Sequence, residues 1–279
     1  MATIERLSLT ILVALCCISR ALAQGQPGAA AGGDAENVAK QLANPIANLV
    51  SIPLQFNWEE GVGPNDDLRT VVNFQPVVPF TLNEDWNVIG RMILPYLSQP
   101  SLAPGAPSAS GVGDMLLSLF FSPVKSDVAI WGVGPVVALP MTTDPFLGSG
   151  KWSAGPTGVV LKQSGQWTFG ALVNHLWSFA DTGDIERNDV NQSYLQPFVA
   201  YTTKSAVTFN VSSESTANWE APSGEEWTVP ININVSKVTK LGPFPFSLGA
   251  GAGVFVEKPE GAPEWKLRLT ATLILPRSR

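Results

Sequence analysis

The chain has 279 residues, a net charge of −6 and a mean hydropathy of +0.14, and 45% of its residues are apolar. An acidic chain without a basic run is a poor nucleic-acid binder, because phosphate contacts need clustered Lys and Arg, so we expect no nucleic-acid partner. With two cysteines and one histidine, the chain has too few soft ligands for a transition-metal site, and we expect no cofactor.

Residues 1–23 have the layout of a secretory signal peptide. Arg6 precedes an apolar stretch from Leu7 to Ile18, and Ala21-Leu22-Ala23 matches a cleavage site before Gln24. This stretch is too short to span a bilayer as a helix. We therefore expect a secreted protein that loses residues 1–23, and with them both cysteines, so that disulfides and thiol chemistry are excluded from the mature chain.

Residues 24–49 form the next segment, which begins with a Gly/Ala/Pro-rich stretch and is predicted to be flexible. Asp34 is a suitable N-cap for a short helix from Ala35 to Ala43, which Asn44-Pro45 would end. The folded domain is expected over residues 50–279.

From residue 50 onward, apolar residues recur at every second position, the pattern of a strand with one apolar and one polar face. Twelve such segments begin near residues 50, 69, 86, 112, 128, 154, 167, 192, 206, 227, 244 and 265. Each has about 9–11 residues, the length of a tilted strand that crosses a bilayer. No downstream apolar run is long enough for a transmembrane helix.

The connections between these segments are alternately long and short. Long ones include Ser98–Gly111, Ala180–Asn191 and Ser213–Glu226, and short ones include Ser164–Gln166 and Thr203–Ser205. Glu214 is expected in the last of these long loops. Outer-membrane barrels have short periplasmic turns and longer outer loops. The sequence therefore predicts an all-β fold, a closed antiparallel transmembrane β-barrel of about 12 strands.

Tryptophans gather at the two ends of the predicted strands. Seven of them are candidates for a membrane-interface girdle: Trp58, Trp86, Trp152, Trp167, Trp177, Trp227 and Trp265. Amphipathic indole rings form such girdles at both membrane interfaces. A soluble β-sandwich with tryptophans in its core is the alternative, but it would place them in mid-strand more often.

The polar faces of the strands are expected to line the lumen. The candidates are Gln55, Asn57, Asn73, Gln75, Asn87, Arg91, Asp114, Asn232, Asn234, Lys266 and Arg268. A charge facing lipid in mid-strand would cost about 2–4 kcal/mol. Arg91 should therefore face the lumen, with Asp114 on the next strand as its nearest partner.

Six prolines fall inside predicted strands: Pro76, Pro95, Pro135, Pro156, Pro197 and Pro230. Proline cannot donate a hydrogen bond to the ladder between strands, and a closed barrel has no edge strand to hold it. These positions should therefore mark bulges or strand ends.

His175 is the only histidine, and a serine-type hydrolase in the membrane would need it as a base beside a serine and an orienting group. The sequence contains no Gly-x-Ser-x-Gly and marks no nucleophile, so we favour a histidine at the lipid–water boundary and expect no enzymatic activity. Asn191-Gln192-Ser193 matches a glycosylation sequon, which we interpret as a chance match in a bacterial barrel.

Motifs of a known family are spread along the whole mature chain. They include residues 44–53 (NPIANLVSIP), 63–65 (GPN), 73–77 (NFQPV), 82–87 (LNEDWN), 130–135 (IWGVGP), 147–156 (LGSGKWSAGP), 191–192 (NQ), 196–198 (QPF), 216–221 (TANWEA), 227–230 (WTVP) and 257–259 (EKP). With these motifs the chain resembles a bacterial family of outer-membrane transporters named for the MetA pathway of phenol degradation. The resemblance implies an outer-membrane barrel that passes small or aromatic compounds, without catalytic residues.

The sequence thus favours a channel for passive passage of small molecules, aromatic or hydrophobic ones among them, in the outer membrane of a Gram-negative-type bacterium. Its expected partners are outer-membrane lipids and the solute. A structural or adhesive barrel with a plugged lumen is the main alternative, and a membrane-embedded hydrolase is a third.

Overall fold

The structure is a computed structural model that describes residues 29–126, 128–183, 187–241 and 244–275. The predicted signal peptide, residues 1–23, lies outside the described residues. No helix within the described ranges is long and apolar enough to cross a membrane.

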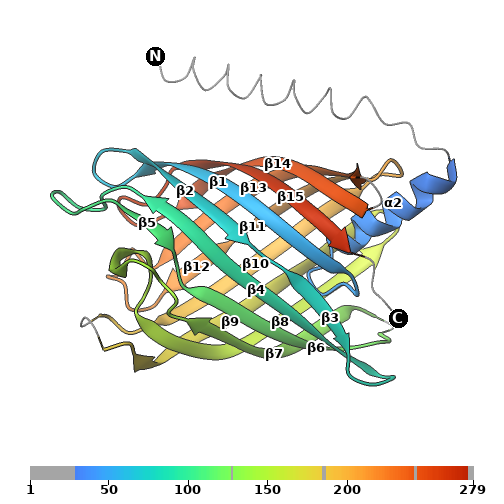
Figure 1. Cartoon of the computed structure of the whole chain (residues 1–279), viewed down its shortest axis with the longest axis horizontal. Coiled ribbons are helices and arrows are strands. Elements are labelled where there is room, and N and C mark those ends of the chain that lie inside the picture. Colours follow the sequence, from blue (N-terminus) through green and yellow to red (C-terminus); the bar gives the residue numbers. More distant parts are fainter. Residues whose placement is uncertain (1–28, 127, 184–186, 242–243, 276–279) are drawn as a thin grey trace, which may run out of the picture.

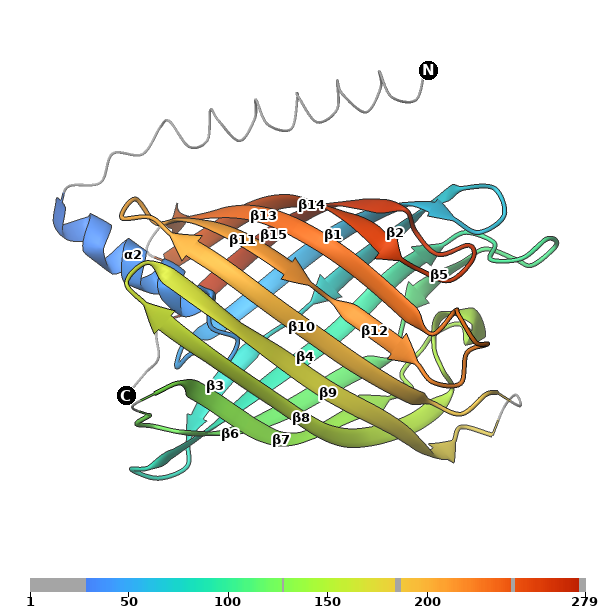
Figure 2. The same cartoon turned by 180° about the vertical axis from the view of Figure 1, so that it is seen from behind.

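The chain forms a closed antiparallel β-barrel of twelve spanning strands, which confirms the predicted fold (Figures 1 and 2). The barrel closes where β1 (Val50–Val62) pairs with β15 (Trp265–Leu275). The other strands are β2 (Asp67–Phe74), β3 (Val77–Thr81), β4 (Trp86–Gln99), β5 (Ala109–Val112), β6 (Met115–Pro123), β7 (Ile130–Leu139), β8 (Lys151–Ser164), β9 (Trp167–Asp181), β10 (Asn191–Thr202), β11 (Val207–Ser213), β12 (Ser215–Asn218), β13 (Trp227–Leu241) and β14 (Phe244–Glu257). The predicted segments begin within three residues of the observed spanning strands, but several strands are longer than expected, with 14 or 15 residues in β8, β9 and β13.

Three spanning strands are each broken into two pieces, and a proline lies at each break. β2 and β3 are separated at Pro76, and β5 and β6 at Gly113, whose N–H donates to the carbonyl of Pro95 at 2.9 Å. The third break separates β11 from β12 at Glu214. The paired stretches of β10 on either side of this break end at Phe198 and Leu195, and Pro197 lies in the gap between them. Because a proline has no N–H to offer, the ladder stops locally at each break.

The third break corrects two predictions. Ser213–Glu226 is not one loop, because the strand resumes as β12 and continues to Asn218. Glu214 consequently lies within a spanning strand and not in an outer loop.

Pro135 and Pro156 do not mark bulges or strand ends, so the prediction is wrong for these two residues. They lie directly opposite each other in an even register between β7 and β8. The ladder is interrupted instead on the far side of each proline: β6 loses its pairing beside Pro135, and β9 loses its pairing beside Pro156. Each proline therefore turns its missing donor away from the other, and the β7–β8 pair stays intact.

The two ends of the barrel differ. The end that carries Val50 and Leu275, which we call the terminal end, has the short turns, and the opposite loop end has the long connections (Figures 1 and 2). The helix α2 (Ala29–Leu42) lies at the terminal end. It begins six residues before the predicted start at Ala35, because Ala29, Ala30 and Ala31 are strong helix formers that offset the two glycines after them.

Large apolar side chains cover the outside of the barrel. On β9, Val173 and Trp177 are 46% and 50% exposed, whereas Leu172 and Leu176, which point inward, are buried. This alternation holds around the barrel, so the outer face presents an apolar belt of the kind that faces lipid.

All nine tryptophans lie toward the ends of strands. Three are at the terminal end (Trp86, Trp131 and Trp167), and six are at the loop end (Trp58, Trp152, Trp177, Trp219, Trp227 and Trp265). Each group contains one edge-to-face pair of rings: Trp86 with Trp131, whose centroids are 5.9 Å apart, and Trp219 with Trp227, whose centroids are 6.0 Å apart. Trp131 and Trp219 were not among the predicted girdle residues.

Candidate functional site: the barrel lumen

One side of the lumen wall is polar, and Gln55 on β1 lies at its centre. The side-chain oxygen of Gln55 accepts hydrogen bonds from the amides of Asn57 at 3.3 Å, Asn73 at 3.2 Å and Gln75 at 3.2 Å. Strand alternation brings these four amides to the inner face of β1 and of the neighbouring strand, β2 with its continuation. They form one connected network.

Glu214 is the acidic centre of the same wall. Its carboxylate accepts two hydrogen bonds from Arg268, at 2.7 and 2.8 Å, and one from Lys266 at 3.2 Å. Arg268 also donates through Nε to Asn57 at 2.7 Å, which joins the charged cluster to the amides. A bidentate guanidinium–carboxylate pair is both strong and directional. The break beside Pro197 thus places the carboxylate of Glu214 between two buried cations, Arg268 and Lys266.

Arg91 on β4 differs from Arg268 and Lys266 in its hydrogen-bond partner. Its guanidinium donates to the side-chain oxygen of Gln75 at 3.4 Å, and no carboxylate of the described residues forms an ion pair with it. The predicted pair with Asp114 is wrong. Asp114 accepts hydrogen bonds from the backbone N–H and the hydroxyl of Ser149, at 2.6 and 2.8 Å. The reason is the break between β5 and β6, which removes Asp114 from the regular alternation on which the prediction depended.

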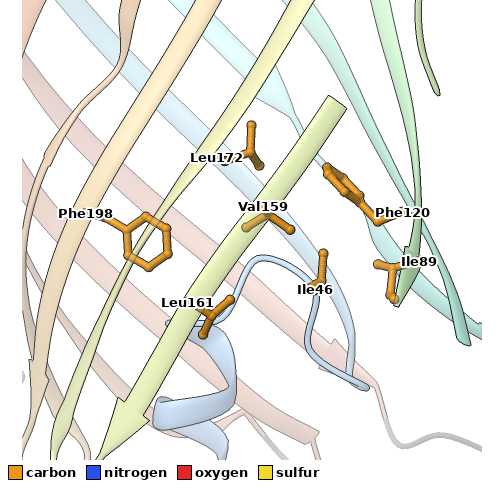
Figure 3. Close-up of a cluster of buried hydrophobic side chains, with 7 residues drawn as sticks. All are labelled: Ile46, Ile89, Phe120, Val159, Leu161, Leu172 and Phe198. Carbon is orange, nitrogen blue, oxygen red and sulfur yellow. The ribbon is translucent and has the colours of Figure 1, made fainter. Parts of the chain in front are cut away.

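The opposite side of the lumen wall is apolar (Figure 3). Its buried cluster comprises Ile46, Ile89, Phe120, Val159, Leu161, Leu172 and Phe198. Six of these residues come from β4, β6, β8, β9 and β10, and the seventh, Ile46, comes from the segment that precedes the barrel. The lumen therefore has a polar, charged half and an apolar half.

The segment before β1 enters the lumen at the terminal end. Ile46 is 4% exposed and contacts the apolar wall, and a turn in which its N–H donates to the side chain of Asn44 at 3.0 Å holds it there. Just before this turn, α2 packs Ala39 against Ala206 and Val238, which lie beside two of the short turns. Helix and turn together cover part of the terminal mouth.

A cavity of about 310 Å³ remains between this segment and the polar wall. Arg91, Glu214 and Arg268 supply its charged lining, and Leu42 and Pro45 of the N-terminal segment contribute apolar lining. Pockets for small molecules in proteins begin at about 300 Å³, so this space has room for one small molecule of the size of a substituted benzene.

The remaining lumen candidates also belong to inner faces. Asn87 shares the inner face of β4 with Ile89, and Asn234 lines the cavity. Asn232 is 1% exposed, and its side chain has no hydrogen-bond partner among the described residues. Gly253 explains how Asn232 fits, because a Cβ there would lie 2.4 Å from the Asn232 side-chain oxygen. In the described part of the chain, no three His, Asp or Glu side chains gather as metal ligands.

Sequence reasoning missed two residues of this site. Glu214 carries a signal in retrospect, since Pro197 on the preceding strand predicts an interruption nearby, but the strand it interrupts is short and easily taken for a loop. Ile46 carries none, because a single apolar residue in a turn does not indicate which wall it contacts.

Solved structures with the same architecture were found by comparison. An outer membrane channel from Pseudomonas putida F1 has a TM-score of 0.62 and 15% identity, and the match covers 81% of this chain and 96% of that one. The NanC porin has a TM-score of 0.52 and 9% identity, with 82% and 100% covered. The outer membrane phospholipase A of Escherichia coli has a TM-score of 0.46 and 10% identity, with 88% and 98% covered. No family model and no curated protein matches the sequence. The fold is that of outer-membrane β-barrels.

Proposed function

We propose that this chain is an outer-membrane channel for the passive passage of small molecules, and that its N-terminal segment closes the terminal mouth. The observation that carries the proposal is the cavity of about 310 Å³ inside a closed barrel, between the charged wall and the N-terminal segment. A barrel that served only as a scaffold would have no need of an internal cation such as Arg91, which forms no ion pair with any carboxylate of the described residues.

The solute class follows from the lining of this cavity. An apolar body fits against Leu42 and Pro45, and a polar or anionic group fits beside Arg91. The resemblance to the transporters of the MetA pathway of phenol degradation supports aromatic compounds as the solutes. The apolar outer belt and the two groups of tryptophans support an outer-membrane location in a Gram-negative-type bacterium, after removal of residues 1–23.

The alternative function, a structural barrel with a plugged lumen, also has an observation in its favour. Ile46 is buried in the apolar wall, and the lumen is partly filled by its segment. The two functions differ in whether this segment can leave. Ile46 is the residue of the segment that packs into the apolar wall, so a substitution at this position tests whether the segment can leave.

The test is single-channel recording in planar bilayers with the full chain, Ile46→Asp, and Ile46→Val as the matched control. A carboxylate is costly in an apolar cluster, so Ile46→Asp should displace the segment and raise the open probability and conductance, while Ile46→Val should behave as the wild type. Reconstituted liposomes should take up benzoate faster than glucose.

A second variant keeps the outcome clear. Deletion of residues 29–48 removes the segment without placing a charge in the lumen. If this variant and Ile46→Asp both insert as folded barrels but conduct no ions, the channel proposal is overturned and the plugged, structural barrel is correct.

A further inference from the structure

Four side chains linked by hydrogen bonds lie on the outer face of the barrel at the loop end, on the opposite side of the wall from the lumen. His175 Nδ1 is 2.8 Å from Ser193 Oγ, and His175 Nε2 is 3.1 Å from the side-chain oxygen of Asn191. Trp219 donates its indole N–H to Ser193 Oγ at 2.9 Å.

The backbone explains why these side chains meet. Ser193 on β10 is the direct cross-strand partner of His175 on β9, and Asn191 shares the face of Ser193 two positions away. The backbone N–H of Trp219 donates to the backbone carbonyl of Asn191 at 2.8 Å, which holds the indole beside the serine. The outward direction is clear from Val173 and Trp177 on the same face of β9, which are exposed, and from Leu176, which is buried inside.

The donor and the acceptor of each hydrogen bond among these four side chains can be assigned. An indole nitrogen can only donate, so Ser193 Oγ accepts from Trp219 and has one proton of its own to give. At the other end, the amide oxygen of Asn191 can only accept, so the proton of a neutral His175 sits on Nε2. Nδ1 therefore presents its lone pair to the hydroxyl of Ser193. A serine whose proton points at a base, with the base oriented by a third group, is the arrangement of nucleophilic acyl transfer.

We propose that Ser193, His175 and Asn191 form a hydrolase site for the acyl esters of membrane lipids, on the lipid-facing surface of the barrel. Ser193 is the nucleophile, His175 is the general base and acid, and Asn191 is a positioning residue. The activity lies beyond the proposed channel function and does not use the lumen.

The reaction needs only an ester and water. Ser193 Oγ bonds to the carbonyl carbon while His175 Nδ1 takes the hydroxyl proton. The bond from that carbon to the alcohol oxygen then breaks, and His175 returns the proton to the leaving alcohol. Water attacks the acyl-serine, gives one proton to His175, and releases the fatty acid as Oγ regains its proton. The indole N–H of Trp219, 2.9 Å from Ser193 Oγ, is a donor beside the reacting oxygen that can stabilise the negative charge of the tetrahedral intermediate.

The surroundings select a lipid substrate. Below the cluster, β9 and β10 present two exposed apolar cross-strand pairs, Val173 with Leu195 and Phe169 with Val199. These residues form a continuous apolar track into the membrane, along which an acyl chain can lie. Trp177, whose ring centroid is 4.0 Å from that of His175, and Trp219 place the cluster at the membrane interface, where ester bonds of lipids are found.

The test uses the full chain refolded from inclusion bodies, so that no membrane lipase contaminates it, in phosphatidylethanolamine/phosphatidylglycerol vesicles. Release of fatty acid is measured together with covalent labelling by a fluorophosphonate probe, located by peptide mass spectrometry. The wild type should release fatty acid and carry the label on Ser193. Ser193→Ala should lose both, and His175→Asn should slow both by at least about a hundredfold, the scale of general-base catalysis.

Three controls separate catalysis from folding. Ser110→Ala removes an exposed hydroxyl that binds Ser98 at 3.2 Å on other strands, and should change nothing. Asn191→Asp keeps an oxygen acceptor for His175 and should retain activity, whereas Asn191→Leu should lose it. All variants should keep the heat-modifiable gel mobility of a folded barrel and the channel conductance of the wild type.

Two results would overturn the inference. One is a folded wild type that releases no fatty acid. The other is release that persists in Ser193→Ala or His175→Asn. Because conductance is recorded on the same preparations, failure of the hydrolase site and failure of the proposed channel are distinguishable.

Discussion

Glu214 and Arg91 are charged lumen residues in opposite situations. Glu214 is paired with two cations, whereas Arg91 has an amide oxygen as its hydrogen-bond acceptor. A paired buried charge is essential to its partners, because removing one member leaves the others uncompensated. A charge with only a weak partner contributes little to stability and is available to a solute.

We expect Glu214→Gln to lower the free energy of unfolding by about 3 kcal/mol, the scale of breaking a buried ion pair. The substitution keeps the shape of the side chain but leaves Arg268 and Lys266 without a carboxylate. Urea unfolding in lipid vesicles, followed by tryptophan fluorescence, measures the effect. Arg91→Gln is the matched control and should lower the stability much less. An equal loss in both variants would contradict the distinction between the two residues.

Strand alternation predicted Gln55, Asn57 and Arg268 on polar faces, because each lies within a regular stretch of strand. It failed for Asp114 and Glu214, which lie at strand breaks. A break is caused by a proline on a neighbouring strand, so the direction of these two side chains depends on a contact across the sheet that a single strand pattern does not contain.

At the scale of elements, the β8–β9 pair depends on a close approach of two backbones. Gly155 lies in the interrupted part of the ladder, and a Cβ at this position would be 1.8 Å from the backbone oxygen of His175. Gly155 and His175 lie on strands that long ladders of hydrogen bonds hold in place, so moving either backbone to make room costs free energy.

We therefore expect Gly155→Ala to lower the temperature at which the barrel loses its heat-modifiable gel mobility, because the new methyl group must push β8 and β9 apart. Gly158→Ala is the control on the same strand. Its Cβ would meet its nearest neighbours at 3.7–3.9 Å, which is ordinary contact, and its transition should stay near that of the wild type. Similar shifts for both variants would show that the close approach is not the cause.

Strand positions were largely predictable because the period of two and the turn residues are local signals. The prolines were harder to interpret, since the effect of Pro135 and Pro156 depends on their being opposite each other. That relation is set by the register between β7 and β8, and no local pattern states the register.

At the scale of the whole molecule, the separation of long and short connections gives the barrel a direction in the membrane. The long connections, with Ser108 and Ser223 exposed in them, share one end, and Ser164 ends β8 beside a short turn at the other. We expect the loop end to face outside. On intact cells, Ser108→Cys and Ser223→Cys should react with an impermeant maleimide, and Ser164→Cys should react only after the outer membrane is permeabilised. The reverse labelling would invert the orientation.

The architecture of the whole barrel was predictable from the number and spacing of the strands, but the closed terminal mouth was not. Ile46 belongs to a buried cluster whose other members lie on five strands that are distant from it in sequence. Contacts of this kind arise only when the sheet has closed, and they leave no periodic signal.

The position of Ile46 also has a consequence for the order of assembly. The segment that carries it precedes every strand in the sequence, whereas the cluster in which it is buried is built from β4, β6, β8, β9 and β10. Its docking must therefore follow the pairing of these strands. Because only residues 47–49 separate Ile46 from β1, the short tether keeps the segment at a high local concentration near the mouth. The opening proposed for this segment consequently needs no partner protein to reverse it.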